Sequence, residues 1–177
     1  GRLFDGQNVW IKPLKFAFAL VIYLLTLVYF ARWLPQGTLN ARPMRLYLAV
    51  VSMAVIVEMI WIGGAAAYAT ASHYNRSNAI MALIYPVMGL FAVILTSASG
   101  VFGWLIWRNG DAELDPALRL AIALGLVLTA VLTVVAASTL SSQPGHFVGT
   151  PVTGAAIPVL GWSREVGDLR VAHFLAT

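Results

Sequence analysis

The sequence lacks cysteine and has few charged residues. None of its 177 residues is Cys, and Asp, Glu, Lys and Arg together make up only 10% of the chain. The absence of cysteine excludes a disulfide framework and thiolate metal sites. Soluble domains carry about 25% charged residues. So few charged residues could not cover the surface of a soluble protein of this length.

Familiar catalytic motifs are absent as well. The sequence contains no HExxH zinc motif, no glycine-rich phosphate-binding loop and no G-x-S-x-G elbow around Ser163. No signal peptide is visible, because residues 1–10 are polar. The first residue is Gly, and the last residues continue an apolar helical pattern. We therefore expect the natural chain to extend beyond one or both of these ends.

Apolar residues dominate what is present. They make up 60% of the chain, and the mean hydropathy is +0.83. These values predict an integral membrane protein whose main solvent is lipid. The net charge of +4 is then explained by basic loops near anionic lipid headgroups rather than by nucleic acid. We expect membrane lipids as partners and no nucleic acid.

The hydrophobic runs predict an all-α, polytopic transmembrane helix bundle in one domain. Four complete spans and the start of a fifth are expected, at residues 11–34, 44–71, 79–107, 116–138 and 168–177 onward. Asp115 and Pro116 have the form of an N-cap followed by proline at the first helical position. Residues 140–167 contain too many Gly and Pro residues for a span. Their apolar content predicts an ordered loop at the membrane interface.

The rarer side chains gather on one side of the predicted bundle, opposite the short arginine-containing connections. This polar face is expected to hold Asp5, Gln7, Asn8, Lys12, Lys15, His73, Tyr74, Asn75, Arg76, His146, Trp162, Asp168, Arg170 and His173. Asp168 is expected to cap the last helix, on which Arg170 and His173 share a face. The two sides carry nearly equal numbers of Lys and Arg. We favour an extracytoplasmic polar face in a bacterial inner membrane.

Three short patterns resemble a family of uncharacterised bacterial polytopic integral membrane proteins. They are WIKPLKF at residues 10–16, SHYN at residues 72–75 and GWS followed by GDLR and HF within residues 161–174. The resemblance covers most of the chain. It implies a longer protein, with helices before and after this chain, and it implies no particular reaction.

Glu58 is the only acidic residue within an apolar run. A charged carboxylate facing lipid costs roughly 2.5–3.5 kcal/mol, so Glu58 should face the bundle interior, either protonated or paired. A proton or ligand site and a neutral carboxyl bonded to a neighbouring helix both fit this position. Lys15 is its expected partner. Otherwise Lys12 and Lys15 are interpreted as lysines that extend from a helix end towards the interface.

Three functions remain open from the sequence. An accessory or scaffold subunit of a larger membrane complex, with other membrane proteins as partners, is favoured because no complete catalytic constellation is present. A haem- or metal-binding redox protein would use His73 and His173, with His146 as a further candidate ligand. A membrane enzyme or transporter would have its site near Glu58. An absorption spectrum of the purified protein separates the redox protein from the other two.

Overall fold

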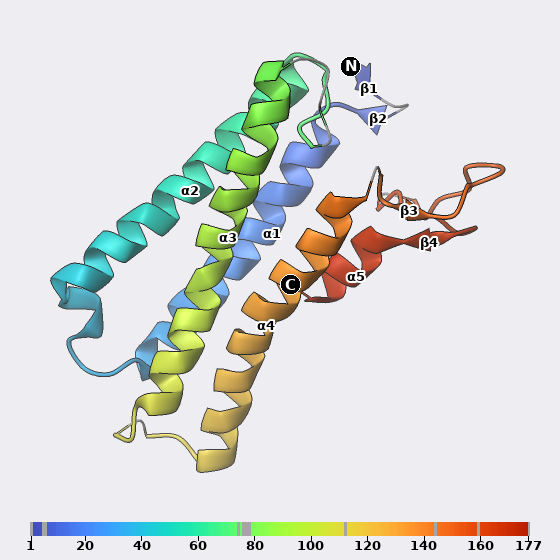
Figure 1. The fold of residues 1–177 in the computed structure, drawn as a ribbon. Coiled ribbons are helices and arrows are strands. Elements are labelled where there is room, and N and C mark those ends of the chain that lie inside the picture. The colour runs from blue at the N-terminus through green and yellow to red at the C-terminus, as the bar shows by residue number, and fades with distance from the viewer. Residues whose placement is uncertain are drawn as a thin grey trace.

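The computed structural model describes residues 2–4, 7–73, 75, 79–111, 113–143, 145–158 and 160–176. These residues confirm the predicted all-α bundle (Figure 1). Its helices are α1 (Ile11–Phe30), α2 (Arg42–Ala67), α3 (Ala79–Arg108), α4 (Pro116–Ser142) and the short α5 (Leu169–Ala176). The first four, with α1 extended by a 3-10 turn to Trp33, are long and apolar enough to cross a membrane. The protein is therefore an integral membrane protein.

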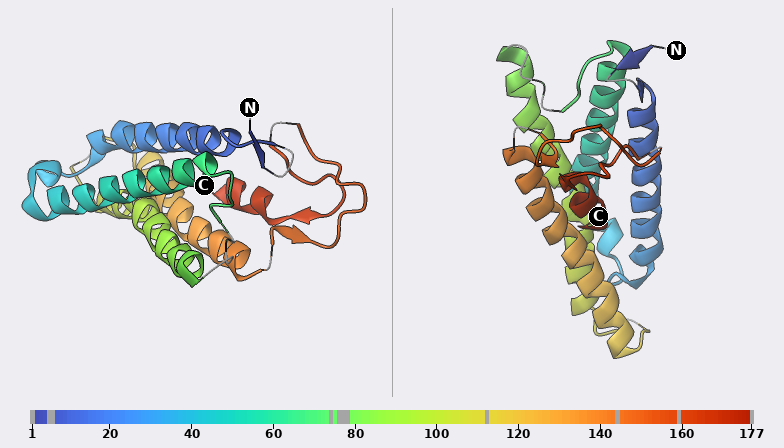
Figure 2. Two further views of the ribbon diagram at one scale, coloured as in Figure 1. Left: turned by 90° about the horizontal axis from the view of Figure 1, so that it is seen from above. Right: turned by 90° about the vertical axis from the view of Figure 1, so that its right-hand side faces the viewer.

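The long helices run alternately up and down, so that their connections lie at two ends (Figure 1). The α1–α2 and α3–α4 connections share one end. The N-terminus and the α2–α3 connection lie at the other, and the α4–α5 segment lies towards that end as well. Figure 2 shows this segment and α5 gathered on one side of the bundle. Asp5, Tyr74, Arg76 and Thr177, which we expected at the polar face or in the last span, lie outside the described residues.

Local chemistry explains where the helices begin and end. Asp115 Oδ1 accepts hydrogen bonds from the backbone N–H groups of Ala117 and Leu118, at 2.9 and 3.2 Å, which confirms the predicted N-cap of α4. Helix α2 ends at Ala67, before the expected residue 71, because Ala69 has a left-handed φ of 51°. Helix α4 continues to Ser142, beyond the expected residue 138.

The core is centred on α3, which packs against both α2 and α4. Small residues allow this close approach. A Cβ on Gly103 would lie 2.7 Å from the carbonyl oxygen of Ala123 on α4 and 2.9 Å from the Leu126 Cβ. The buried apolar residues of this core are Leu27, Leu34, Val51, Ala98, Phe102, Ile106 and Leu126.

The segment between α4 and α5 is held by short backbone pairings. Strand β3 (Phe147–Val148) pairs antiparallel with β4 (Gly167–Asp168), and an isolated bridge joins Ala156 to Ser163. The Glu165 carboxylate accepts a hydrogen bond from the Thr153 hydroxyl, and this bond lowers the pKa of Glu165 to about 2. Helix α5 lies against α4, where the Thr133 hydroxyl donates to the Ala176 carbonyl at 3.2 Å. A second two-stranded pairing, β1 (Leu3–Phe4) with β2 (Gln7–Asn8), precedes α1.

Candidate functional site

A cluster of polar side chains lies where α1 begins and α2 ends. Lys12 projects from the first turn of α1, and its Nζ lies 3.0 Å from Nδ1 of His73 in the α2–α3 connection. The buried Ser72 hydroxyl lies 3.0 Å from the same nitrogen. The indole of Trp61 on α2 donates to the Ser72 carbonyl at 2.8 Å and thereby holds the connection in place. We call Lys12, Glu58, Ser72 and His73 the polar cluster.

The partners of Nδ1 determine where the imidazole of His73 carries its proton. A lysine ammonium has three donors and no acceptor. Nδ1 is therefore the acceptor from Lys12, and the ring proton lies on Nε2. His73 consequently presents a hydrogen-bond donor, not a lone pair, at its outer nitrogen.

Glu58 is buried on α2, at 5% exposure, as the sequence predicts for an acid in a span. The Glu58 carboxylate interacts electrostatically with the ammonium of Lys12. The predicted pairing of Glu58 with Lys15 is wrong. Lys15 Nζ instead donates to the Leu160 carbonyl at 3.3 Å. Three helical residues rotate a side chain by about 60° from its starting direction. That rotation directs Lys12 towards α2 and Lys15 towards the segment before α5.

Aromatic rings enclose His73. Its ring centroid lies 5.9 Å from that of Phe16 on α1 and 6.4 Å from that of Tyr85 on α3. Burial lowers the pKa of His73 to about 3, and the positive charges of Lys12 and His173 act in the same direction. His73 is therefore neutral at physiological pH.

The pKa of His73 predicts how stability depends on pH. The folded protein binds no proton at His73 until about pH 3, whereas the unfolded chain binds one below 6.5. Stability should therefore be greatest above pH 6.5 and should fall as the pH is lowered towards 3. At pH 5 the loss is roughly 1–2 kcal/mol. Thermal unfolding in detergent between pH 7 and 5 measures this loss.

The variant H73Q should unfold with a clearly smaller dependence on pH, because the titrating imidazole is gone. H146Q is the comparison variant. Burial lowers the pKa of His146 as well, so H146Q should also reduce the dependence, but by less than H73Q, because the pKa of His73 is lowered further. An H73Q protein whose melting temperature falls with pH as steeply as that of the parent would refute the assignment.

The structure brings two of the three histidines into the same neighbourhood. His173 on α5 is close enough to act electrostatically on His73. His146 lies in the segment before β3, beside the start of α5, and the charge of Lys12 acts on it as well. Its carbonyl accepts from the Leu169 N–H at 2.9 Å, and its ring packs against Phe147 at a centroid distance of 4.1 Å.

The remaining residues of the predicted polar face have structural partners. Asp168 caps α5 by accepting from the Arg170 N–H at 3.0 Å, and its buried carboxylate forms an ion pair with the Arg170 guanidinium at 2.6 Å. The same guanidinium donates to the Gly161 carbonyl. Trp162 packs against Phe174 on α5, with ring centroids 5.1 Å apart. Asn75 donates to Thr70 and Ala71, and this closes the turn after α2.

The donor set does not favour a metal or haem iron. Among the residues that the structure describes, no group of three or more His, Cys, Asp or Glu side chains could hold a metal ion. A histidine that ligates a metal through one nitrogen usually donates the proton of its other nitrogen to an acceptor. At His73 the second nitrogen accepts from an ammonium instead, and that cation would also repel a metal ion.

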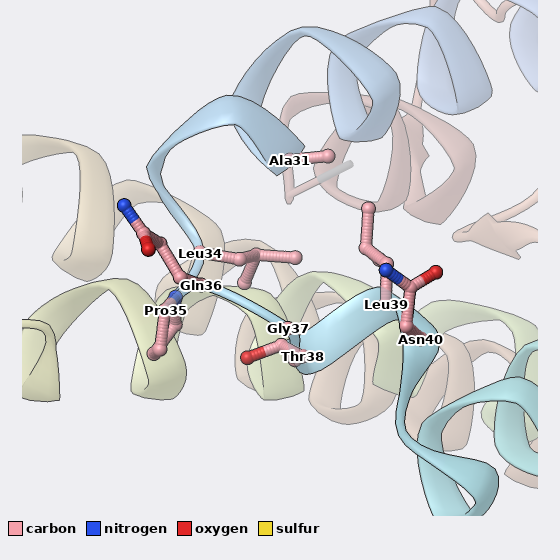
Figure 3. Close-up of a pocket in the computed structure, with 8 residues that line it drawn as sticks. All are labelled: Ala31, Leu34, Pro35, Gln36, Gly37, Thr38, Leu39 and Asn40. Carbon is pink, nitrogen blue, oxygen red and sulfur yellow. The ribbon is translucent and has the colours of Figure 1, made fainter.

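Two cavities lie away from the polar cluster. One, of about 210 Å³, is formed by the α1–α2 connection and is lined by residues 31 and 34–40 (Figure 3). None of these eight side chains is titratable, so this cavity offers no acid–base chemistry. The other is lined by Arg42, Arg45 and Leu46.

Sequence reasoning places Lys12 on the polar face but interprets it as a lysine that extends towards the interface, and it misses the contact with His73. It assigns no role to Ser72. The only available signal for Lys12 is its position three residues before Lys15 at the start of a span, which places a cation near the helix end without indicating its direction. Ser72 begins the SHYN pattern, but that pattern does not indicate what the serine contacts.

Comparison with known proteins finds no family model, no curated protein and no solved structure that matches the chain.

Proposed function

We propose that this protein is a proton-translocating membrane transporter, which carries protons down a pH gradient without a second substrate and whose site is the polar cluster of Glu58, Lys12, Ser72 and His73. The observation that carries the proposal is a buried carboxylate within a span, under the influence of a lysine that is itself hydrogen-bonded to a histidine. Ionisable residues within spans are costly, and they commonly mark ion paths and proton relays.

The arrangement of the cluster supports proton transfer. Glu58 lies within α2, Lys12 at the start of α1, and His73 in the connection beyond α2. Together with His173 on α5, these groups lead from the interior of the bundle towards one of its ends. A protonatable carboxylate inside the bundle and a chain of nitrogen groups leading away from it are the parts that proton uptake requires.

Proton movement can be measured in liposomes that contain the natural full-length protein and an internal pH-sensitive dye. An imposed pH gradient should decay through the parent protein. E58Q should slow that decay by about 100-fold or more, the usual range when a proton-transfer group is lost. K12M should slow it as well, because it removes the cation that acts on Glu58. E113Q is the matched control, since Glu113 is exposed at the opposite end of the bundle.

Proton flux at the parental rate in correctly folded E58Q and K12M proteins would overturn the proposal. So would a parent protein through which no gradient decays. An accessory subunit of a larger complex would behave in this second way and would co-purify with other membrane proteins in mild detergent. A haem protein would instead show a Soret band that H73A abolishes.

We further place the protein in a bacterial inner membrane, with the polar cluster on the extracytoplasmic side. The support is the distribution of arginine, because the opposite end carries Arg residues in and beside short connections, as cytoplasmic ends do. These are Arg32, Arg42, Arg45, Arg108 and Arg119.

A further inference from the structure

Two arginines line a cavity at the opposite end of the bundle from the polar cluster. Arg42 and Arg45 lie in the first turn of α2, and with Leu46 they line a space of about 350 Å³. Both side chains are exposed. Residues three and four apart lie on the same face of a helix, so the two guanidinium groups face the cavity from one side of α2.

These two guanidinium groups differ from the other arginines of this end. Arg32 lies over the Tyr29 ring at 3.8 Å and donates to the Tyr29 carbonyl. Arg119 donates to the Asn109 carbonyl, and Arg108 lies 5.7 Å from the Trp104 ring. Within the described part of the chain, neither the Arg42 nor the Arg45 guanidinium has a hydrogen bond, an ion pair or a ring contact. Two adjacent cations are thus left without an internal counter-charge.

An apolar stripe continues from the cavity along α2. Leu46, Val50 and Met53 are 67%, 44% and 57% exposed. Their spacing of four and three residues places them on the same face of α2 as Arg42. Helix α2 is long and apolar enough to span a membrane. In that position the stripe would face hydrocarbon, and the arginines at the start of α2 would lie at the level of the headgroups.

We propose that Arg42 and Arg45 bind the phosphate of an anionic phospholipid, with one acyl chain lying along Leu46, Val50 and Met53. Guanidinium groups bind phosphate through paired hydrogen bonds, and their charge favours anionic over zwitterionic headgroups. The continuous stripe favours a lipid over free phosphate, because it provides the apolar contact that only an acyl chain can use. This site is separate from the polar cluster and does not depend on the proposed transport.

The proposal can be tested by native mass spectrometry of the full-length protein in mild detergent with phosphatidylglycerol or phosphatidylcholine added. We expect tightly retained phosphatidylglycerol and much weaker retention of phosphatidylcholine. The double variant R42Q/R45Q should bind phosphatidylglycerol about tenfold more weakly or worse. R32Q/R108Q is the matched control with the same loss of charge, and it should retain most of the affinity. R42K/R45K keeps the charge without the paired donors and should be intermediate.

Several outcomes would overturn this inference. Equal loss in R32Q/R108Q would show that the whole basic end attracts lipid without a site. Displacement of phosphatidylglycerol by millimolar inorganic phosphate would show that the phosphate alone is bound. Unchanged binding by R42Q/R45Q would remove the arginines from the site. Should the double variant fold poorly, R42Q and R45Q are compared singly against R32Q, with the melting temperature of each as the test of folding.

Discussion

Replacing Glu58 by lysine should leave little folded protein in the membrane, whereas E58Q should accumulate normally. Glu58 is buried, and the nearby charge is the ammonium of Lys12. In E58K the new ammonium would itself be buried without a carboxylate partner, and it would lie near the Lys12 ammonium. A buried charge without a partner costs about 3–5 kcal/mol, and repulsion from Lys12 increases this cost. E58Q is nearly isosteric and adds no charge.

The yield of monodisperse protein after mild solubilisation measures this effect. The most informative control is the double variant E58K/K12E, which exchanges the two charges and so restores one cation and one carboxylate at the two positions. It should recover a substantial part of the yield that E58K loses, whereas E58K/K15E should not, because Lys15 is directed towards Leu160. Recovery by K15E equal to that by K12E would show that the pairing is wrong. Normal yield and melting of E58K alone would show that Glu58 does not face a cation.

The second large effect is expected at Gly103, where α3 and α4 approach most closely. A Cβ at this position would meet a backbone oxygen at 2.7 Å and two side-chain carbons at 2.9 and 3.0 Å. Because the oxygen belongs to the backbone of α4, the helices must separate to admit a side chain. Forcing extra groups into a packed core costs about 1–3 kcal/mol or more. G103A should therefore lower the melting temperature by about 5 °C or more, and G103V should lower it further.

G89A is the matched control for this experiment. Gly89 lies in the same helix and is exposed, and a Cβ added there would have no atom of the described residues within 4 Å. The same substitution at this position adds a methyl group without a clash, and alanine favours helix more than glycine does. G89A should leave the melting temperature unchanged or raise it. A similar decrease in both variants would mean that glycine matters for α3 itself rather than for its contact with α4.

Gly100 forms a second close contact between α3 and α4. A Cβ there would lie 3.1 Å from the Ala130 Cβ on α4, a tight contact with a side chain rather than with backbone. The sequence SASG at residues 97–100 is typical of close helix packing in membranes. It does not show that the tightest contact occurs one turn later, at Gly103. That position depends on how α4 is rotated about its own axis.

Properties that depend on one residue and its near neighbours were determined by the sequence. Low charge and long apolar runs predict helices in lipid, because backbone polar groups must bond within the segment where no water is present. The N-cap at Asp115 follows from a carboxylate beside the first free N–H groups of a helix. The inward position of Glu58 follows from the cost of placing a charge against lipid.

Only the tertiary structure decided which side chains meet. Lys12 and His73 are 61 residues apart, and their contact depends on the rotation of α1, the end of α2 at Ala67 and the path of the connection that follows. A rotation of about 60° separates Lys12 from Lys15, so hydrophobicity alone places both at the helix start and cannot tell which one faces Glu58. Local energies set the elements, whereas packing between distant elements sets the site.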